Sequence, residues 1–146
     1  MLRWLLGTDY DSGAERRVQS HLEYVFRDSK YDIELRDEEY QVLQVEKAKR
    51  LVSNCFTKWA DYHPEFPDCD DFVWVLLGDV IREAYRGGCR LKPAIFTAVL
   101  EKNRARHFVL IFLVMENDIE KRYVVEAQTG RWRLQEPDEV LEEVEG

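Results

Sequence analysis

One cysteine of this chain stands among acidic residues at the start of an apolar segment, in the stretch Pro67-Asp68-Cys69-Asp70-Asp71-Phe72. Apolar residues recur at helical spacing from Cys69 to Ala84, so we expect a helix over this range. Asp68 and Asp71 have the spacing of a capping box. The N–H groups and dipole of a helix start favour a thiolate, whereas three adjacent carboxylates disfavour it. A bound cation is one way to resolve this conflict.

A predicted hairpin supplies a candidate partner for the thiol. The segment 107–115 is apolar on both faces, which indicates a central strand, and Asn117-Asp118 suits a tight turn before the returning strand 123–128. With a loop of two or four residues, His107 would lie on the same face as Glu126 or Gln128. Packing the Cys69 helix on that face would bring the thiol to His107. Cysteine nucleophiles require such a base and a third group that orients it.

These residues carry a family resemblance. The segments 69–72, His107 and 126–129 resemble the papain-like domain at the C-terminus of the Marasmius oreades agglutinin and related small phage and bacterial proteins, whose starts are similar to Arg3-Trp4-Leu5-Leu6-Gly7. The resemblance implies a papain-like fold and a hydrolase, a cysteine peptidase that acts on protein or peptide substrates. Its catalytic triad would be Cys69, His107 and Glu126.

The resemblance also implies dependence on a divalent cation such as calcium, with Asp70 and Asp71 in metal binding. Carboxylates at 68, 70, 71 and 126 would crowd around the thiol, and hard oxygen ligands of this kind suit calcium or manganese rather than zinc. Val73 stands where alanine is usual in the family, and Ala127 where proline is common. The lectin domain of the agglutinin has no counterpart in this chain, so the resemblance implies no sugar binding.

Each candidate residue also has a purely structural interpretation. Cys69 lies in the middle of an apolar helical stripe, which is typical of a core residue. His107 could be a hydrogen-bonded residue at a strand edge, and the aspartates could be ordinary helix caps. Glu126 alternates onto a sheet face that we expect to be covered, so its carboxylate needs a partner. The alternative function is therefore a non-catalytic metal-binding interaction module on the same scaffold.

Composition limits the remaining possibilities. The 146 residues, 45% of them hydrophobic, suit one domain over 1–146 with its own core. A formal charge of −8 argues against nucleic acid or an anionic membrane as partner. Three cysteines without a CxxC pair argue against a disulfide framework. The apolar run at 2–6 is too short for a signal peptide or membrane span, so we expect a soluble, cytoplasmic chain.

The remaining elements predict an α+β fold in which helices come first and an antiparallel sheet follows. A capping box at Ser12 and Glu15 indicates a helix through about Phe26. The other expected elements are a strand at 2–6, a connection at 27–39, a strand at 40–45, a helix at 46–62 that buries Cys55, strands at 94–100 and 131–134, and an acidic, solvated helix from Pro137.

Overall fold

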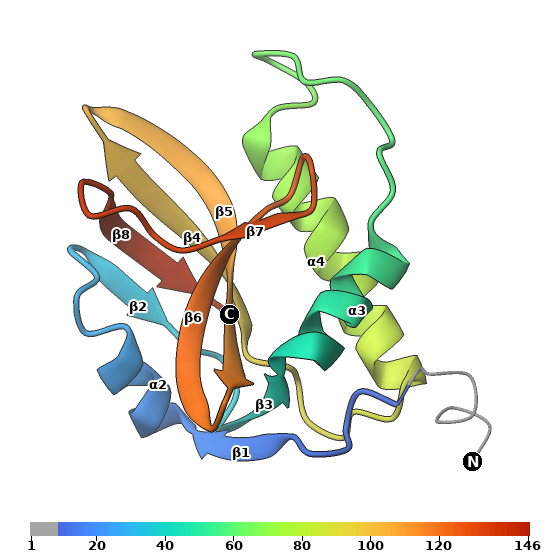
Figure 1. Cartoon of the computed structure of the whole chain (residues 1–146). Helices are drawn as coiled ribbons and strands as arrows, with labels where there is room; N and C mark the ends of the chain where they lie inside the picture. Colours follow the sequence, from blue (N-terminus) through green and yellow to red (C-terminus); the bar gives the residue numbers. More distant parts are fainter. Residues whose placement is uncertain (1–8) are drawn as a thin grey trace.

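The computed structural model describes residues 9–146, and it confirms the predicted α+β class (Figure 1). Within residues 9–146, three helices cover parts of a curled sheet of eight strands. The helices are α2 (Gln19–Val25), α3 (Val45–Cys55) and α4 (Cys69–Arg86). The strands are β1 (Glu15–Val18), β2 (Asp32–Glu34), β3 (Glu39–Gln44), β4 (Ile95–Lys102), β5 (Ala105–Glu116), β6 (Ile119–Glu126), β7 (Arg131–Arg133) and β8 (Val140–Glu145).

The sheet is mixed rather than purely antiparallel. Its main path runs β1-β3-β5-β4-β8-β2, with β6 paired to β5 and β7 paired to β6. The pairs β3–β5 and β2–β8 are parallel, and the others are antiparallel. The β5–β6 hairpin turns at Asn117 and Asp118, whose φ values of 52° and 61° fit the tight turn predicted from the sequence.

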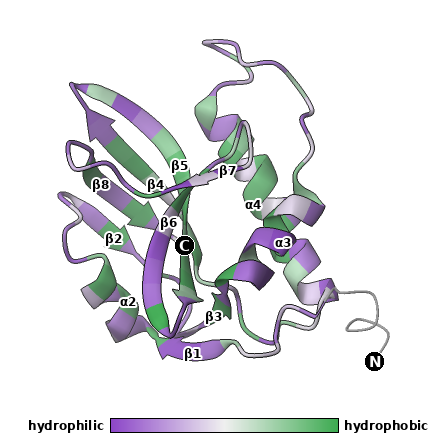
Figure 2. Cartoon of the chain, viewed as in Figure 1, coloured by the Kyte–Doolittle hydropathy of each residue, from purple (hydrophilic) through white to green (hydrophobic). Residues whose placement is uncertain are grey.

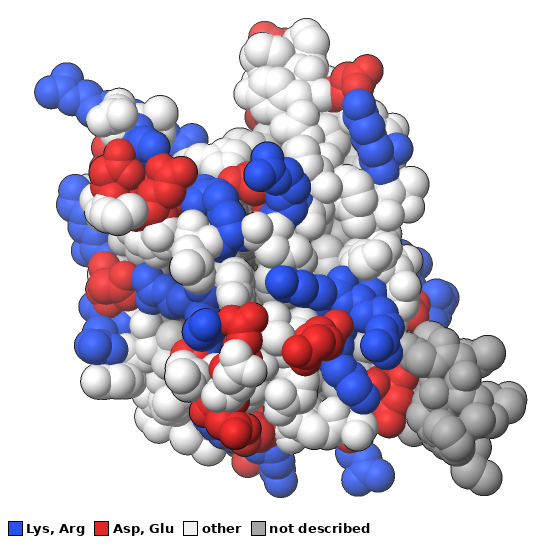
Figure 3. Space-filling view, in the orientation of Figure 1, with Lys and Arg blue, Asp and Glu red and all other residues white. Residues whose placement is uncertain are grey.

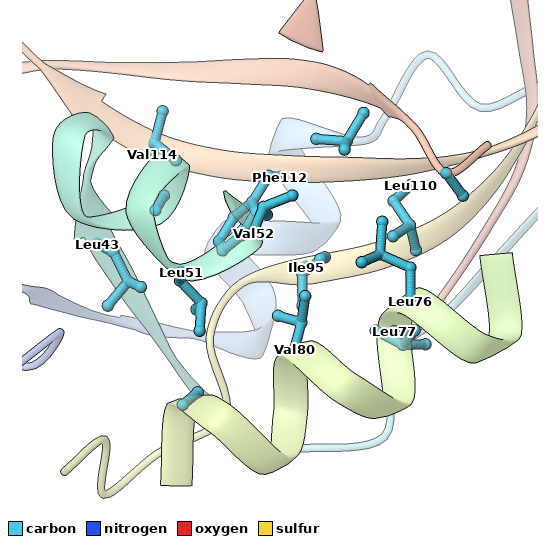
Figure 4. Close-up of a cluster of buried hydrophobic side chains, with 14 of the residues drawn as sticks. Leu43, Leu51, Val52, Leu76, Leu77, Val80, Ile95, Leu110, Phe112 and Val114 are labelled. Atoms are coloured by element: carbon cyan, nitrogen blue, oxygen red, sulfur yellow. The ribbon is translucent and has the colours of Figure 1, made fainter. Parts of the chain in front are cut away.

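Two apolar cores lie on opposite faces of β5, and this strand is accordingly among the most hydrophobic segments of the chain (Figure 2). In the first core, α3 and α4 pack on the even-numbered side chains Leu110, Phe112 and Val114 (Figure 4). In the second, Leu22 and Phe26, at α2 and its C-terminal end, pack with the odd-numbered Val109, Ile111 and Leu113. The prediction that β5 is a central strand buried on both faces is confirmed.

The helix α4 forms where the sequence predicts it. Its buried residues recur at three- and four-residue spacing, so a single stripe faces the sheet. That stripe consists of Phe72, Val73, Leu76, Leu77, Val80 and Ala84. The sequence therefore located the head of α4 at Cys69 correctly.

The helix expected from Ser12 to Phe26 is wrong over its first half. Residues Glu15–Val18 form β1, which pairs antiparallel with β3, and only Gln19–Val25 are helical. Backbone hydrogen bonds to a strand distant in the sequence thus override the local capping signal. The segment 27–39, expected to be a plain connection, contains β2, and α3 ends at Cys55 instead of continuing to 62.

The acidic C-terminal helix is also wrong. Residues Val140–Glu145 form β8, which pairs with β4 and β2 inside the sheet. Glu139 and Glu142 are buried rather than solvated, because Arg133 and Arg106 from other strands bind them. The expected strand at 2–6 lies outside the described residues. Within 9–146, no helix has the length and hydrophobicity needed to span a bilayer.

Candidate functional site

The head of α4 is held by the capping box that the sequence predicts. Asp68 is the N-cap residue, and its backbone N–H donates to Asp71 Oδ2 at 3.0 Å. The peptide between Phe66 and Pro67 is cis and leads the chain into this cap. Cys69 follows as the first helical residue and is half-buried. The local sequence therefore fixes both the start of α4 and the directions of the acidic side chains around it.

Three carboxylates converge at this point. One oxygen each from Asp68, Asp70 and Asp71 lies within 4.8 Å of the others. Asp68 Oδ1 is buried and has no hydrogen-bond partner among residues 9–146. A buried charged oxygen without a partner is unfavourable, and so is close repulsion between carboxylates. The group consequently fits a hard divalent cation such as calcium or manganese, which binds carboxylate oxygens.

A cavity of about 360 Å³ adjoins this cluster. Its lining includes Phe108 of β5, whose ring contacts Trp74 of α4 with 6.1 Å between centroids. Arg106 also lines the cavity, and its Nε donates to Glu142 at 2.9 Å. The complete lining is Asp68, Cys69, Asp70, Val99, Arg106, Phe108 and Glu143. The cavity thus combines acidic, basic and aromatic walls beside the cysteine.

His107 and Glu126 contact each other as predicted, with 2.6 Å between His107 Nε2 and Glu126 Oε2. Arg133 donates to the second oxygen of Glu126 at 2.9 Å and binds both oxygens of Glu139 at 2.5 and 2.8 Å. The hydrogen bond to Glu126 raises the pKa of His107, although burial opposes this. Burial would raise the pKa of Glu126, but the hydrogen bonds from His107 and Arg133 outweigh it and lower that pKa. We call His107, Glu126, Arg133 and Glu139 the arginine network.

The predicted catalytic triad is not assembled, because Cys69 and His107 belong to opposite faces of the sheet. The even-numbered residues of β5 face α4, and Phe108 is the one that lines the cavity beside Cys69. His107 pairs across the strands with Leu100, which lies in the second core on the far face. Because β5 is apolar on both faces, its sequence did not reveal which face α4 covers. Among residues 9–146, neither His107 nor Glu126 contacts the thiol.

Glu126, also predicted as a metal ligand, is not among the convergent carboxylates within residues 9–146. Its two oxygens are bound by His107 and Arg133, whereas the convergent group at the head of α4 consists of Asp68, Asp70 and Asp71. The other two thiols have a structural role. Burial raises the pKa of both Cys55 and Cys89 to about 12, so neither is a reactive thiolate near neutral pH.

One feature that the sequence analysis missed lies between α3 and the β6–β7 turn. Trp132 stacks on Phe112 with 5.5 Å between ring centroids and an interplanar angle of 21°. It lines a cavity of about 390 Å³, with Lys49, Val52, Ser53, Phe56, Thr129 and Gly130. We call this cavity the Trp132 cleft. The available signal was an aromatic residue two positions after the Thr129-Gly130 turn, on a strand of only three residues.

Comparison with known proteins gives a structural likeness only. No known protein family matches the sequence, and no curated protein matches it. Two solved structures share the fold at 16% identity: a complex of PSL1a with E64 (TM-score 0.75) and Polyporus squamosus lectin bound to the human-type influenza-binding epitope Neu5Acα2-6Galβ1-4GlcNAc (TM-score 0.72). Each match covers 90% of this chain, and 51% and 49% of the respective solved chains. The chain therefore spans about half the length of these structures.

These matches correct the family expected from the sequence. The matched proteins are named as PSL1a and as a lectin, not as a peptidase, and in this chain the residues of the expected triad lie on two faces of the sheet. The assignment as a papain-like cysteine peptidase is therefore wrong, and with it the peptide substrate and the hydrolase activity. Nothing in the matches points to a phage protein. The likeness shows the fold, and the function must be argued from the chain itself.

Proposed function

We propose that this chain is a binding domain rather than an enzyme, that it takes a divalent cation at the head of α4, and that its ligand is a carbohydrate held beside that cation. The observation that carries the proposal is Asp68 Oδ1, which is buried without a hydrogen-bond partner among the described residues, inside a group of three carboxylates. Calcium or manganese bound by Asp68, Asp70 and Asp71 would satisfy this oxygen and offset the repulsion among the side chains.

The adjoining cavity supports a ligand at the same place. Calcium takes about six to eight oxygen ligands, and three aspartates supply only some of them. Asp68 and Asp70 also line the cavity of about 360 Å³, so the remaining positions would open toward it. Paired hydroxyl groups of a sugar ring are oxygen ligands of a suitable kind, and Phe108 offers an apolar surface for the ring.

Carbohydrate as the ligand class has one further support. Polyporus squamosus lectin, which shares the fold, was solved with a glycan bound. That match involves only about half of the lectin chain, so the argument for this chain rests on its own carboxylates and cavity. The lectin suggests which class of compound to test first. The family resemblance seen in the sequence implied no sugar binding, and this proposal replaces that expectation.

Binding of the neutral disaccharide Galβ1-4GlcNAc, followed by NMR, tests the proposal. We expect the amide signals around Cys69 and Asp70 to shift with calcium or manganese present, and the response to disappear with a chelator. Asp70→Asn should weaken binding by about tenfold or more, which is about 1.4 kcal/mol. The matched control is Asp79→Asn on the same helix, because Asp79 pairs with Arg82 outside the cluster.

Two results would contradict the proposal. Sugar binding that ignores the chelator would separate the ligand from the cation. Absence of any shift near Cys69, with the cation present and the protein folded, would remove carbohydrate as the ligand. Cys69→Ser should bind as well as the wild type, because the thiol has no chemical role in this account.

A further inference from the structure

The Trp132 cleft has the features of a second ligand site, and it shares no lining residue with the cavity at the head of α4. Its volume of about 390 Å³ lies within the range of small-ligand pockets, roughly 300–1,000 Å³. One wall is α3, which contributes Lys49 and Ser53. The opposite wall is the β6–β7 turn with Thr129, followed by Trp132. Two aromatic residues, two hydroxyl groups and one ammonium group therefore line the same cleft.

The walls of the cleft are held rigidly. Trp132 stacks on Phe112 and meets Tyr123 edge-on, with 5.8 Å between the latter pair of centroids. Gly130 has a φ of 74°, and a Cβ there would lie 3.1 Å from the Phe56 ring. Only glycine fits this turn without strain or displacement of Phe56. The indole is thus positioned by packing in the absence of any ligand, as a preformed site requires.

The charge of the cleft is unusual for this chain. The protein carries a formal net charge of −8, yet Lys49 is the only charged residue among those that line the cleft. Its Nζ lies 5.9 Å from the Trp132 ring centroid and 5.7 Å from that of Tyr123. Within residues 9–146, Lys49 forms no ion pair. The charge of Lys49 contributes to lowering the pKa of Glu116. That carboxylate is already bound by Lys121 at 2.9 Å and by the Tyr123 hydroxyl at 2.7 Å.

We propose that the Trp132 cleft binds an acidic sugar, a hexuronate. The apolar face of a pyranose ring would cover the indole of Trp132. The carboxylate would pair with the ammonium group of Lys49, and the hydroxyls of Ser53 and Thr129 would exchange hydrogen bonds with the ring hydroxyls. No cation takes part, because no carboxylate lines the cleft. The site therefore goes beyond the cation-dependent site at the head of α4.

Two sugars that differ at one group test this inference. Methyl β-D-glucuronide carries a carboxylate where methyl β-D-glucoside carries a hydroxymethyl group. We expect the glucuronide, titrated with a chelator present, to shift the indole N–H signal of Trp132 in an NMR spectrum. The glucoside should bind about tenfold or more weakly. Lys49→Gln should reduce the affinity for the glucuronide to that for the glucoside.

Controls separate loss of the site from loss of the fold. Lys30→Gln removes another exposed lysine, one placed against Tyr31 away from the cleft, and should leave binding unchanged. Thr129→Val keeps the branched side chain but removes the hydroxyl, which also accepts a hydrogen bond from the Arg131 backbone N–H at 3.3 Å, and it should weaken both sugars equally. Equal affinity for the two sugars, or a Lys49→Gln variant that binds the glucuronide normally, would overturn the inference. An indole signal that both sugars leave unmoved would do the same. Because the chelator is present throughout, none of these results depends on the proposed cation site.

Discussion

Two groups of carboxylates in this chain differ in how their charge is satisfied. In the arginine network, Glu126 and Glu139 are bound by His107 and Arg133 at 2.5 to 2.9 Å. At the head of α4, one oxygen of Asp68 is buried without a hydrogen-bond partner among residues 9–146, and two more aspartates stand beside it. The carboxylates of the arginine network therefore have their charges paired, whereas those at the head of α4 do not.

The difference indicates where an external ligand is needed. Acidic and basic side chains are interspersed over the face of the molecule shown in Figure 3. The arginine network needs nothing further, so it is best explained as structure that ties β5, β6 and β7 to the segment before β8. The head of α4 contains three acids, and no basic side chain of residues 9–146 forms an ion pair with them. A divalent cation supplies what the fold does not.

Removing the positive charge of Arg133, which binds both glutamates of the arginine network, should have the largest effect on stability. Arg133→Gln leaves Glu126 and the buried Glu139 without their shared partner, and we expect the free energy of unfolding to fall by roughly 3 kcal/mol. Denaturant unfolding measures this change. Arg82→Gln, which breaks an exposed pair with Asp79, should change stability by less than about 1 kcal/mol. Equal effects of the two variants would mean that the network is no more than a surface feature.

A smaller effect concerns pH. Because the pKa of His107 is raised in the folded state, the stability contributed by its charge is fully present below its unfolded pKa and is lost as pH rises through the folded pKa. Its side chain is 46% exposed, so we expect a decrease well under about 1 kcal/mol on going above pH 6. His107→Gln should flatten this part of the stability profile. A wild-type profile that rises over this range would contradict the assigned shift.

The sequence predicted well the parts whose signals are local. The capping box of Asp68 and Asp71, the apolar stripe of α4 and the Asn117-Asp118 turn each depend on residues within a few positions of one another. The contact between His107 and Glu126 also followed from the pairing parity of one short hairpin. Local patterns with one strong physical cause were therefore sufficient for these elements and for the location of the acidic cluster.

The failures have a common cause in contacts between residues far apart in the sequence. Ser12 and Glu15 favour a helix locally, but pairing of β1 with β3 is decisive. The acidic end of the chain pairs with β4 and β2 as a strand, and Arg106 and Arg133 neutralise the buried Glu142 and Glu139. No sequence pattern showed which apolar face of β5 would meet α4, and that one ambiguity produced the false triad.

Calcium binding by the wild-type protein, measured by titration calorimetry and by the calcium-dependent change in unfolding free energy, tests the central claim most directly. We predict one site per chain, and stabilisation by about 2.7 kcal/mol when free calcium is 100 times the dissociation constant. Asp68→Asn should keep the cap and the stability of the cation-free protein, since asparagine also caps helices, but should lose both calcium responses. Wild-type protein that neither binds nor is stabilised by calcium or manganese, or an Asp68→Asn variant that responds as the wild type does, would contradict the account.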